Sequence, residues 1–185
     1  MSVGAIVLAA GAGRRFGGVK QLAEVGGRPL LEHAALAVAT FSPRVVVLGH
    51  AAEEIRAIVD LHGAEPALCA AWEDGQSASL RCGIAALGDV DAAVVLLADM
   101  PGITAAAVEA VVAGWDGVAD AVRAMYSGEP SHPVLLSRAL LDRAGELEGD
   151  VGFRALLDGA RVINVEAGHL ADPADIDTRE ELGRR

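Results

Sequence analysis

The residues best suited to chemistry follow a short apolar run near the start of the chain, in the stretch LAAGAGRRFGGVKQL (8–22). Four glycines, two arginines and one lysine stand within ten consecutive positions of it. Glycines let backbone N–H groups close around phosphate oxygens, and basic side chains add charge that the backbone does not supply. In a chain of net charge −11, this local positive charge predicts an anion site whose size suits a triphosphate.

Two widespread phosphate-binding patterns do not fit this loop. The dinucleotide fingerprint G-x-G-x-x-G fails because Phe16 takes the place of the third glycine. The acidic residue that should end the second strand is also missing, since Gly49-His50 stands there. The ATPase pattern G-x-x-x-x-G-K-[ST] fails because Val19 stands where lysine is required. The remaining interpretations are a different triphosphate site or a glycine-rich turn with solvated basic residues.

Asp99 is a candidate metal ligand, because it ends the most apolar run of the chain, DAAVVLLA (91–98). A carboxylate in such a place is costly without a counter-charge. Mg²⁺ prefers oxygen ligands and commonly bridges a carboxylate and phosphates, so it would supply that charge. The alternative is a turn residue ahead of Pro101.

The elements that must position these residues alternate between β-branched runs and Ala/Leu-rich helical runs. Strands that are apolar throughout are buried on both faces, and their alternation with helices predicts a three-layer, doubly wound, mostly parallel α/β sheet. A small antiparallel part is expected from 120–126 and 132–136. Strands are expected at 3–8, 44–49, 66–70, 91–98 and 161–166, and helices at 29–40, 51–61, 76–87, 103–114 and 178–185. Active sites of such sheets lie at the carboxyl ends of the strands, where the glycine loop and Asp99 fall.

Length and composition limit the other classes of function. A chain of 185 residues suits a single domain over residues 1–185. Its acidity and its aromatic content of 3% argue against nucleic acid as a partner. There is no signal-peptide pattern and no membrane-spanning stretch, so we expect a cytoplasmic protein without a membrane partner. Cys69 and Cys82 form no CxxC motif and are expected to be reduced.

The glycine loop is similar to the signature of the MobA-like NTP transferase family, L-A-A-G-x-G-x-R-x-G-x-x-K. Further segments that resemble the family, and in particular its molybdenum cofactor cytidylyltransferase branch, follow in the same order and spacing: EDGQSASLRCGI (73–84), LLADMPGIT (96–104), SHPVLLS (131–137), GDVGFRALL (149–157) and DIDTREEL (175–182). The resemblance covers essentially the whole chain. It implies a Rossmann-like nucleotidyltransferase fold.

The resemblance also implies a reaction and the residues that carry it. In the implied reaction an NMP is joined to a phosphorylated acceptor with release of pyrophosphate. The NMP is CMP from CTP or the NMP of another NTP. The implied acceptor is molybdopterin or the molybdenum cofactor, the cofactor is Mg²⁺, and a molybdoenzyme is a partner for delivery. Catalysis is assigned to Arg15, Lys20 and Asp99, and the metal to Asp99 and Asp177. The nucleotide is assigned to Leu8, Ala9, Ala10, Gly11, Gly13, Arg15, Lys20, Gln76, Ser77, Ser79 and Leu80, and the acceptor to His132, Asp150 and Arg154.

Some of these assignments have structural alternatives. Ser77 and Ser79 could simply start a helix, His132 could be a structural histidine, and Asp177 could be an acidic residue that faces a helix dipole. Two departures from the family pattern, Ser131 for glycine and Arg179 for proline, fall on the acceptor half.

Two other functions compete with nucleotidyl transfer. One is an NAD(P)H-dependent oxidoreductase of the same family, similar to nicotine blue oxidoreductase, against which the missing third glycine counts. The other is a non-catalytic pterin-cofactor delivery protein, which would need the acceptor site but not Arg15, Lys20 or Asp99.

Overall fold

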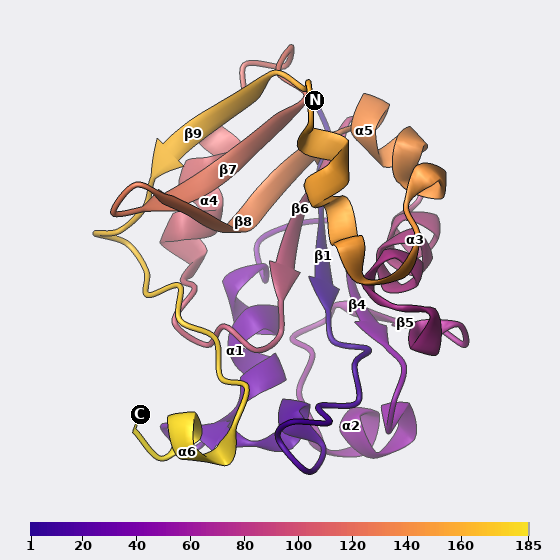
Figure 1. The fold of residues 1–185 in the computed structure, drawn as a ribbon, viewed down its shortest axis with the longest axis vertical. Coiled ribbons are helices and arrows are strands. Elements are labelled where there is room, and N and C mark those ends of the chain that lie inside the picture. The colour runs from indigo at the N-terminus through magenta and orange to yellow at the C-terminus, as the bar shows by residue number, and fades with distance from the viewer. Residues whose placement is uncertain (185) are drawn as a thin grey trace.

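The computed structural model describes residues 1–184, and a seven-stranded sheet organises them (Figure 1). In spatial order the strands are β5 (Glu65–Leu68), β4 (Arg44–Leu48), β1 (Val3–Leu8), β6 (Ala92–Leu97), β8 (Glu129–Ser137), β7 (Ala121–Tyr126) and β9 (Val162–Glu166). Only β8 runs antiparallel to its neighbours in this sheet. A separate small ribbon pairs β2 (Glu24–Val25) with β3 (Arg28–Pro29).

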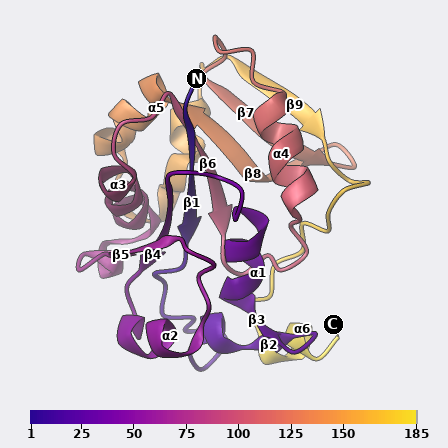
Figure 2. The ribbon, with the colours of Figure 1, turned by 180° about the vertical axis from the view of Figure 1, so that it is seen from behind.

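The alternation of side chains along β1 explains the three layers. Ala5 and Val7 belong to one buried cluster, and Ile6 and Leu8 belong to another on the opposite face, as the period of two in a strand requires. The first face is covered by α1 (Leu30–Ala37), α2 (Ala52–Ile58) and α4 (Ala105–Ala113), and the second by α3 (Gln76–Leu87), α5 (Arg138–Asp142) and the 3₁₀ segments η3 (Arg143–Glu146) and η4 (Gly149–Leu157). Figures 1 and 2 show these helices from the two sides.

The predicted fold class, a mostly parallel doubly wound sheet with a small antiparallel part, is confirmed. The helix over 76–87 has the expected bounds, and Thr104 caps α4 by accepting a hydrogen bond from the Ala107 N–H. The predicted helix 51–61 is shorter, because Ala51 is left-handed (φ 52°) and Val59 is extended. The last helix, α6 (Arg179–Leu182), is a single turn that follows a capping box at Thr178.

The expectation of reduced cysteines is wrong, because Cys69 and Cys82 form a disulfide. Their Cα atoms lie 5.7 Å apart, within the range that a disulfide spans. Cys69 follows β5 and Cys82 lies on α3, so only the packing of the helix against the end of the strand brings them together. No helix within residues 1–184 is long and apolar enough to cross a membrane.

The segment after β9 returns to the carboxyl end of the sheet and packs on the glycine loop (Figure 1). Ile176 forms a small buried cluster with Phe16 of the loop and Leu30, and its backbone N–H donates to the carbonyl of Asp99. The Arg179 guanidinium lies 5.1 Å from the centre of the Phe16 ring. This packing places Asp177 beside the loop, far from its position in the sequence.

Candidate functional site

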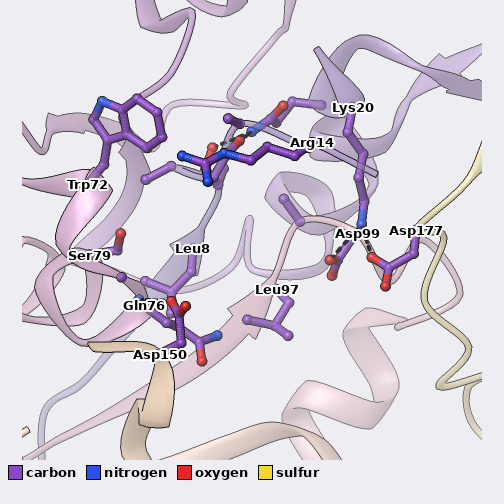
Figure 3. A pocket seen from close by; sticks show the side chains of 18 of the residues that line it. Leu8, Arg14, Lys20, Trp72, Gln76, Ser79, Leu97, Asp99, Asp150 and Asp177 are labelled. Atoms are coloured by element: carbon purple, nitrogen blue, oxygen red, sulfur yellow. Dashed lines mark hydrogen bonds and ion pairs between the residues drawn. The ribbon is translucent and has the colours of Figure 1, made fainter. Parts of the chain in front are cut away.

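A cavity of about 510 Å³ opens at the carboxyl ends of β1 and β6. The glycine loop forms one side of it, and α3 with the turn before it forms another (Figure 3). Most of the predicted nucleotide and catalytic residues line it: Leu8, Ala9, Ala10, Gly11, Gly13, Arg15, Lys20, Gln76, Ser79 and Asp99. Asp150 and Asp177 line the same cavity. The chain therefore brings residues from five separate segments to one site.

The glycine loop is held from beneath by Gln21, a residue that sequence reasoning missed. Its side-chain amide is buried and donates to the carbonyls of Ala9 (2.7 Å) and Gly11 (2.8 Å). Gly13 turns the chain with φ 58°, and a Cβ atom there would lie 3.0 Å from the Gly18 carbonyl oxygen. A side chain at this position would be strained as well as crowded. These contacts hold the backbone of the loop where it borders the cavity.

The charged residues at one end of the cavity form a paired cluster. The Lys20 ammonium lies 2.9 Å from Asp99 Oδ2 and 2.7 Å from Asp177 Oδ1, and Arg15 contacts Asp177 Oδ2 at 2.8 Å. The Lys20 side chain is only 12% exposed. Burial lowers the pKa of Lys20, but the charges and hydrogen bonds of Asp99 and Asp177 outweigh burial, so the net shift is upward. The hydrogen bond from Lys20 lowers the pKa of Asp177. Both shifts favour the charged forms of Lys20 and Asp177.

The donor set of this cluster fits a divalent cation that also binds phosphate. Asp99 Oδ1 is buried and has no hydrogen-bond partner, which leaves an oxygen free for a ligand. Asp99 and Asp177 already converge on one positive charge, that of Lys20. Within residues 1–184 no three His, Cys, Asp or Glu side chains gather into a group that could hold a metal alone. A Mg²⁺ ion held here would complete its shell with phosphate oxygens and water, as is usual for Mg²⁺.

The other end of the cavity carries an aromatic wall that sequence reasoning also missed. Trp72 lines the cavity and makes an edge-to-face contact with His50, with ring centres 5.5 Å apart. It lies directly on Gly49, where a Cβ atom would come within 2.5 Å of the Trp72 side chain. The available signal was a tryptophan four residues before Gln76 in a chain that is only 3% aromatic. Such a wall suits a flat ring.

Two predicted nucleotide residues do not reach the cavity. Ser77 and Leu80 are buried, with 0% and 1% of their surface exposed, and Leu80 belongs to the core cluster beneath α3. Gln76 and Ser79 are three residues apart and so share a side of the helix, and that is the side that faces the cavity. The structure therefore does not bring Ser77 and Leu80 to the lining of this cavity, and their contact with a nucleotide stays a prediction.

A second cavity, of about 770 Å³, borders the first and shares Gln76, Leu97 and Asp150 with it. All three predicted acceptor residues, His132, Asp150 and Arg154, line it. Asp150 Oδ1 accepts a hydrogen bond from the Gln76 backbone N–H (3.2 Å). The two cavities are thus joined at the start of α3, which allows two ligands to meet there.

The ring of His132 is held rather than free. Its Nδ1 lies 3.2 Å from the Val95 carbonyl oxygen, and the ring makes an edge-to-face contact with Phe153, with ring centres 5.4 Å apart. Burial lowers the pKa of His132 below its ordinary value, although the Val95 carbonyl acts in the opposite direction. The ring is neutral at neutral pH and contributes packing and a directed hydrogen bond.

This lowered pKa predicts how stability depends on pH. Below about pH 6.5 the unfolded state takes up a proton that folded His132 resists. Its contribution to stability is therefore complete above that pH and is lost as the pH falls through the folded pKa. When the pH is lowered from about 7.5 to about 5, the melting temperature of His132→Asn should fall by less than that of the wild type. The exposed-site control His169→Asn should follow the wild-type slope, and parallel curves for all three proteins would contradict the prediction.

Comparison with known proteins places these features in a family. A family model described as the MobA-like NTP transferase domain matches residues 5–166. The Bifunctional protein GlmU of Maricaulis maris is 34% identical over 181 residues, which cover 93% of this chain and 39% of that protein. Nicotine blue oxidoreductase of Paenarthrobacter nicotinovorans is 29% identical over 195 residues, covering 97% of this chain and 94% of that protein.

Solved structures agree with the fold. The Rv0371c homologue from Mycobacterium sp. strain JC1 is 33% identical, with a TM-score of 0.84 over 98% of this chain and 93% of that one. Rv0371c of Mycobacterium tuberculosis H37Rv, in complex with manganese, is 24% identical, with a TM-score of 0.79 over 100% of this chain and 97% of that one. The chain spans about two fifths of the GlmU relative, so the activity of that whole protein is not transferred to it.

Proposed function

Because the chain belongs to the MobA-like NTP transferase domain family, we propose that it is a metal-dependent nucleotidyltransferase that prefers CTP and adds CMP to a phosphorylated acceptor of the molybdopterin class. The observation that carries this proposal is the cluster at the end of the first cavity. There Arg15 and Lys20, the only lysine of the chain, meet the carboxylates of Asp99 and Asp177. Two cations for phosphates and two carboxylates for a metal are the groups that transfer of a nucleotidyl unit requires.

The residues that line the cavity support one orientation of a bound nucleotide. Its phosphates would lie along the glycine loop, near Arg15 and Lys20, and its base would lie toward Trp72, Gln76 and Ser79. Figure 3 shows Lys20 on one side of the cavity and Trp72, Gln76 and Ser79 on the other. The choice of CTP rests on the resemblance of the segment GQSASL (75–80) to the cytosine-reading segment of the family.

The proposed step is an in-line displacement at the α-phosphorus. An oxygen of the acceptor phosphate, which is already anionic near neutral pH, attacks the α-phosphorus and forms the new P–O bond. The bond from the α-phosphorus to the bridging oxygen breaks, and pyrophosphate leaves with the electron pair. Lys20 and Arg15 neutralise the charge that develops on the phosphates. A Mg²⁺ ion on Asp99 and Asp177 would add Lewis-acid charge stabilisation. Because the joined cavities would hold both substrates in a fixed orientation, they would raise the rate of transfer further.

Calorimetry tests the proposal. The protein is titrated with CTP, GTP, ATP and NADH, each with Mg²⁺. We expect CTP to bind most tightly, with GTP and ATP weaker and NADH weakest. Tight binding of NADH with no binding of any NTP would overturn the proposal, and GTP as the tightest ligand would correct the nucleotide but keep the reaction.

Arg15→Ala should weaken CTP binding without unfolding the protein. The side chain is 78% exposed, so the fold does not depend on it, whereas a charge-assisted contact to phosphate contributes about 1–3 kcal/mol. Calorimetry with CTP and a thermal melt of the same sample measure both effects. Arg56→Ala, which removes an exposed arginine on α2, is the matched control and should bind like the wild type. A lowered melting temperature with unchanged CTP affinity would assign Arg15 to structure instead.

One comparison favours a second candidate, an NAD(P)H-dependent oxidoreductase. The match to nicotine blue oxidoreductase covers nearly the full length of both chains. Against it, Phe16 stands at the position of the third glycine of the dinucleotide fingerprint and is buried beneath the glycine loop. A dinucleotide site needs glycine at this position so that the helix can pack closely on the strand. The NADH arm of the calorimetric titration separates the two candidates.

A further inference from the structure

Two members of the charged cluster, Asp177 and Lys20, each contact two oppositely charged partners. Asp177 contacts both Arg15 and Lys20, the two cations assigned to phosphates. Lys20 contacts both Asp99 and Asp177, the two carboxylates assigned to the metal. In the ligand-free protein an anion therefore lies where phosphate would bind, and a cation lies between the two metal ligands.

We propose that Asp177 and Lys20 act as internal substitutes for the two ligands, so that nucleotide and metal enter by an exchange of partners. The phosphates take Lys20 and Arg15 from the carboxylates, and the metal takes the carboxylates that are released. This inference rests on the proposed function, because it uses the same assignments. Its new content is that each ligand alone meets a closed cluster and binds poorly, whereas the pair binds well.

Burial explains why either ligand alone is disfavoured. Only 12% of the Lys20 side chain is exposed, and 29% and 24% of the Asp99 and Asp177 side chains. A metal ion without nucleotide must displace the ammonium into surroundings that offer it no phosphate. A nucleotide without metal must bring its negative charge beside two carboxylates that have lost their cation. Groups this shielded from solvent lose more when a partner leaves than exposed groups do.

This exchange is a coupling between two ligands of the protein, separate from the affinity of Mg²⁺ for nucleotide in solution. Each binding event removes the obstacle to the other, so the two affinities must rise together and by the same factor. The protein part of the coupling is visible only when each ligand is studied in the absence of the other. Removing the internal substitute should then raise the affinity of the ligand that it imitates.

The first test measures Mn²⁺ binding to the nucleotide-free protein by electron paramagnetic resonance. Lys20→Met removes the internal cation and keeps the aliphatic chain, so we expect Mn²⁺ to bind about 5- to 150-fold more tightly than to the wild type, the usual range of coupling between sites. Asp99→Asn in the Lys20→Met background should abolish this gain. Equal Mn²⁺ affinity of the wild type and Lys20→Met would overturn the exchange. If Mn²⁺ bound tightly even with Asp99→Asn, the proposed metal site itself would fail.

The second test measures CTP binding in excess chelator, with no divalent metal. Asp177→Asn removes the internal anion, and we expect metal-free CTP to bind more tightly than to the wild type. Glu180→Gln is the matched control, because it removes a negative charge three residues away that is exposed, pairs with Arg184 and has no part in the cluster. Unchanged or weaker CTP binding to Asp177→Asn would overturn the exchange, while the CTP site of the wild type would remain measurable with Mg²⁺.

A third measurement needs no variant, since Lys20 is the only lysine of the chain. Protein labelled with ¹³C at the lysine ε-carbon gives one side-chain signal from that position. Saturation with CTP and Mg²⁺ together should move this signal, because the ammonium changes partners from carboxylates to phosphates. A signal that stays in place when both ligands are bound would contradict the exchange.

Discussion

Asp99→Asn is expected to lower the rate of nucleotidyl transfer by about 100-fold or more, the scale seen when one preorganised electrostatic contact is removed. The amide keeps the shape of the side chain but removes the charge that would hold the metal. Asp99 also has a buried oxygen without a partner, which is the atom that the metal proposal uses. Because a metal at the α-phosphate acts chiefly in the transition state, turnover should fall even when CTP is saturating.

The measurement is a single-turnover rate with saturating CTP, Mg²⁺ and acceptor. Asp89→Asn is the control, since the Asp89 side chain is fully exposed and lies outside the site. A rate for Asp99→Asn within a factor of about three of the wild type would reduce Asp99 to a turn residue. In that event the metal site would have to be rebuilt around Asp177.

Gly75→Ala is the second change with a large expected effect, here on stability. Gly75 precedes α3 with φ 99° and ψ −176°, a region that only glycine adopts readily. A Cβ atom there would lie 2.5 Å from the carbonyl carbon of Gly149 and 2.7 Å from Asp150 Oδ1. Backbone strain and overpacking each cost about 1–3 kcal/mol. We expect the free energy of unfolding to fall by roughly 2–5 kcal/mol, measured by chemical denaturation.

A matched glycine separates the two causes. Gly128 also has a positive φ, 89°, but a Cβ atom there meets no other atom within 4 Å. Gly128→Ala should therefore show the strain without the clash. Equal losses for the two variants would mean that Gly149 and Asp150 yield to the added methyl group at no measurable cost, which would contradict the predicted clash. A larger loss for Gly75→Ala, with a raised KM for the acceptor, would support this contact as the join between the two cavities.

Local patterns in the sequence predicted the elements and the position of the site. The helix 76–87 has its expected bounds because glycines stand at both ends, at Gly75 and Gly88. The apolar run before Asp99 predicted a buried strand, and the general rule for parallel sheets then placed the site at its carboxyl end. These features depend on residues close together in the chain, so the local spacing of apolar and polar residues predicts them.

The remaining features depend on residues far apart in the chain. The pairing of Lys20 with Asp177 spans 157 positions and requires the segment after β9 to return to the glycine loop. The disulfide requires α3 to pack against the end of β5. To predict that Ser77 and Leu80 point into the core, one must know which side of α3 faces the sheet. The weakly amphipathic run SASL does not specify that side. Trp72 and Gln21 likewise became site residues only once their neighbours in space were known.

The most direct test of the central claim follows the phosphorus atoms of CTP. The protein is incubated with Mg²⁺, molybdopterin and CTP labelled either at the α- or at the γ-phosphorus. Nucleotidyl transfer predicts that the α label appears in the acceptor product and that the γ label appears in pyrophosphate, in equal amounts and with the same rate. Transfer of the γ label to the acceptor or to orthophosphate, or retention of both labels in CTP at saturating enzyme, would contradict it.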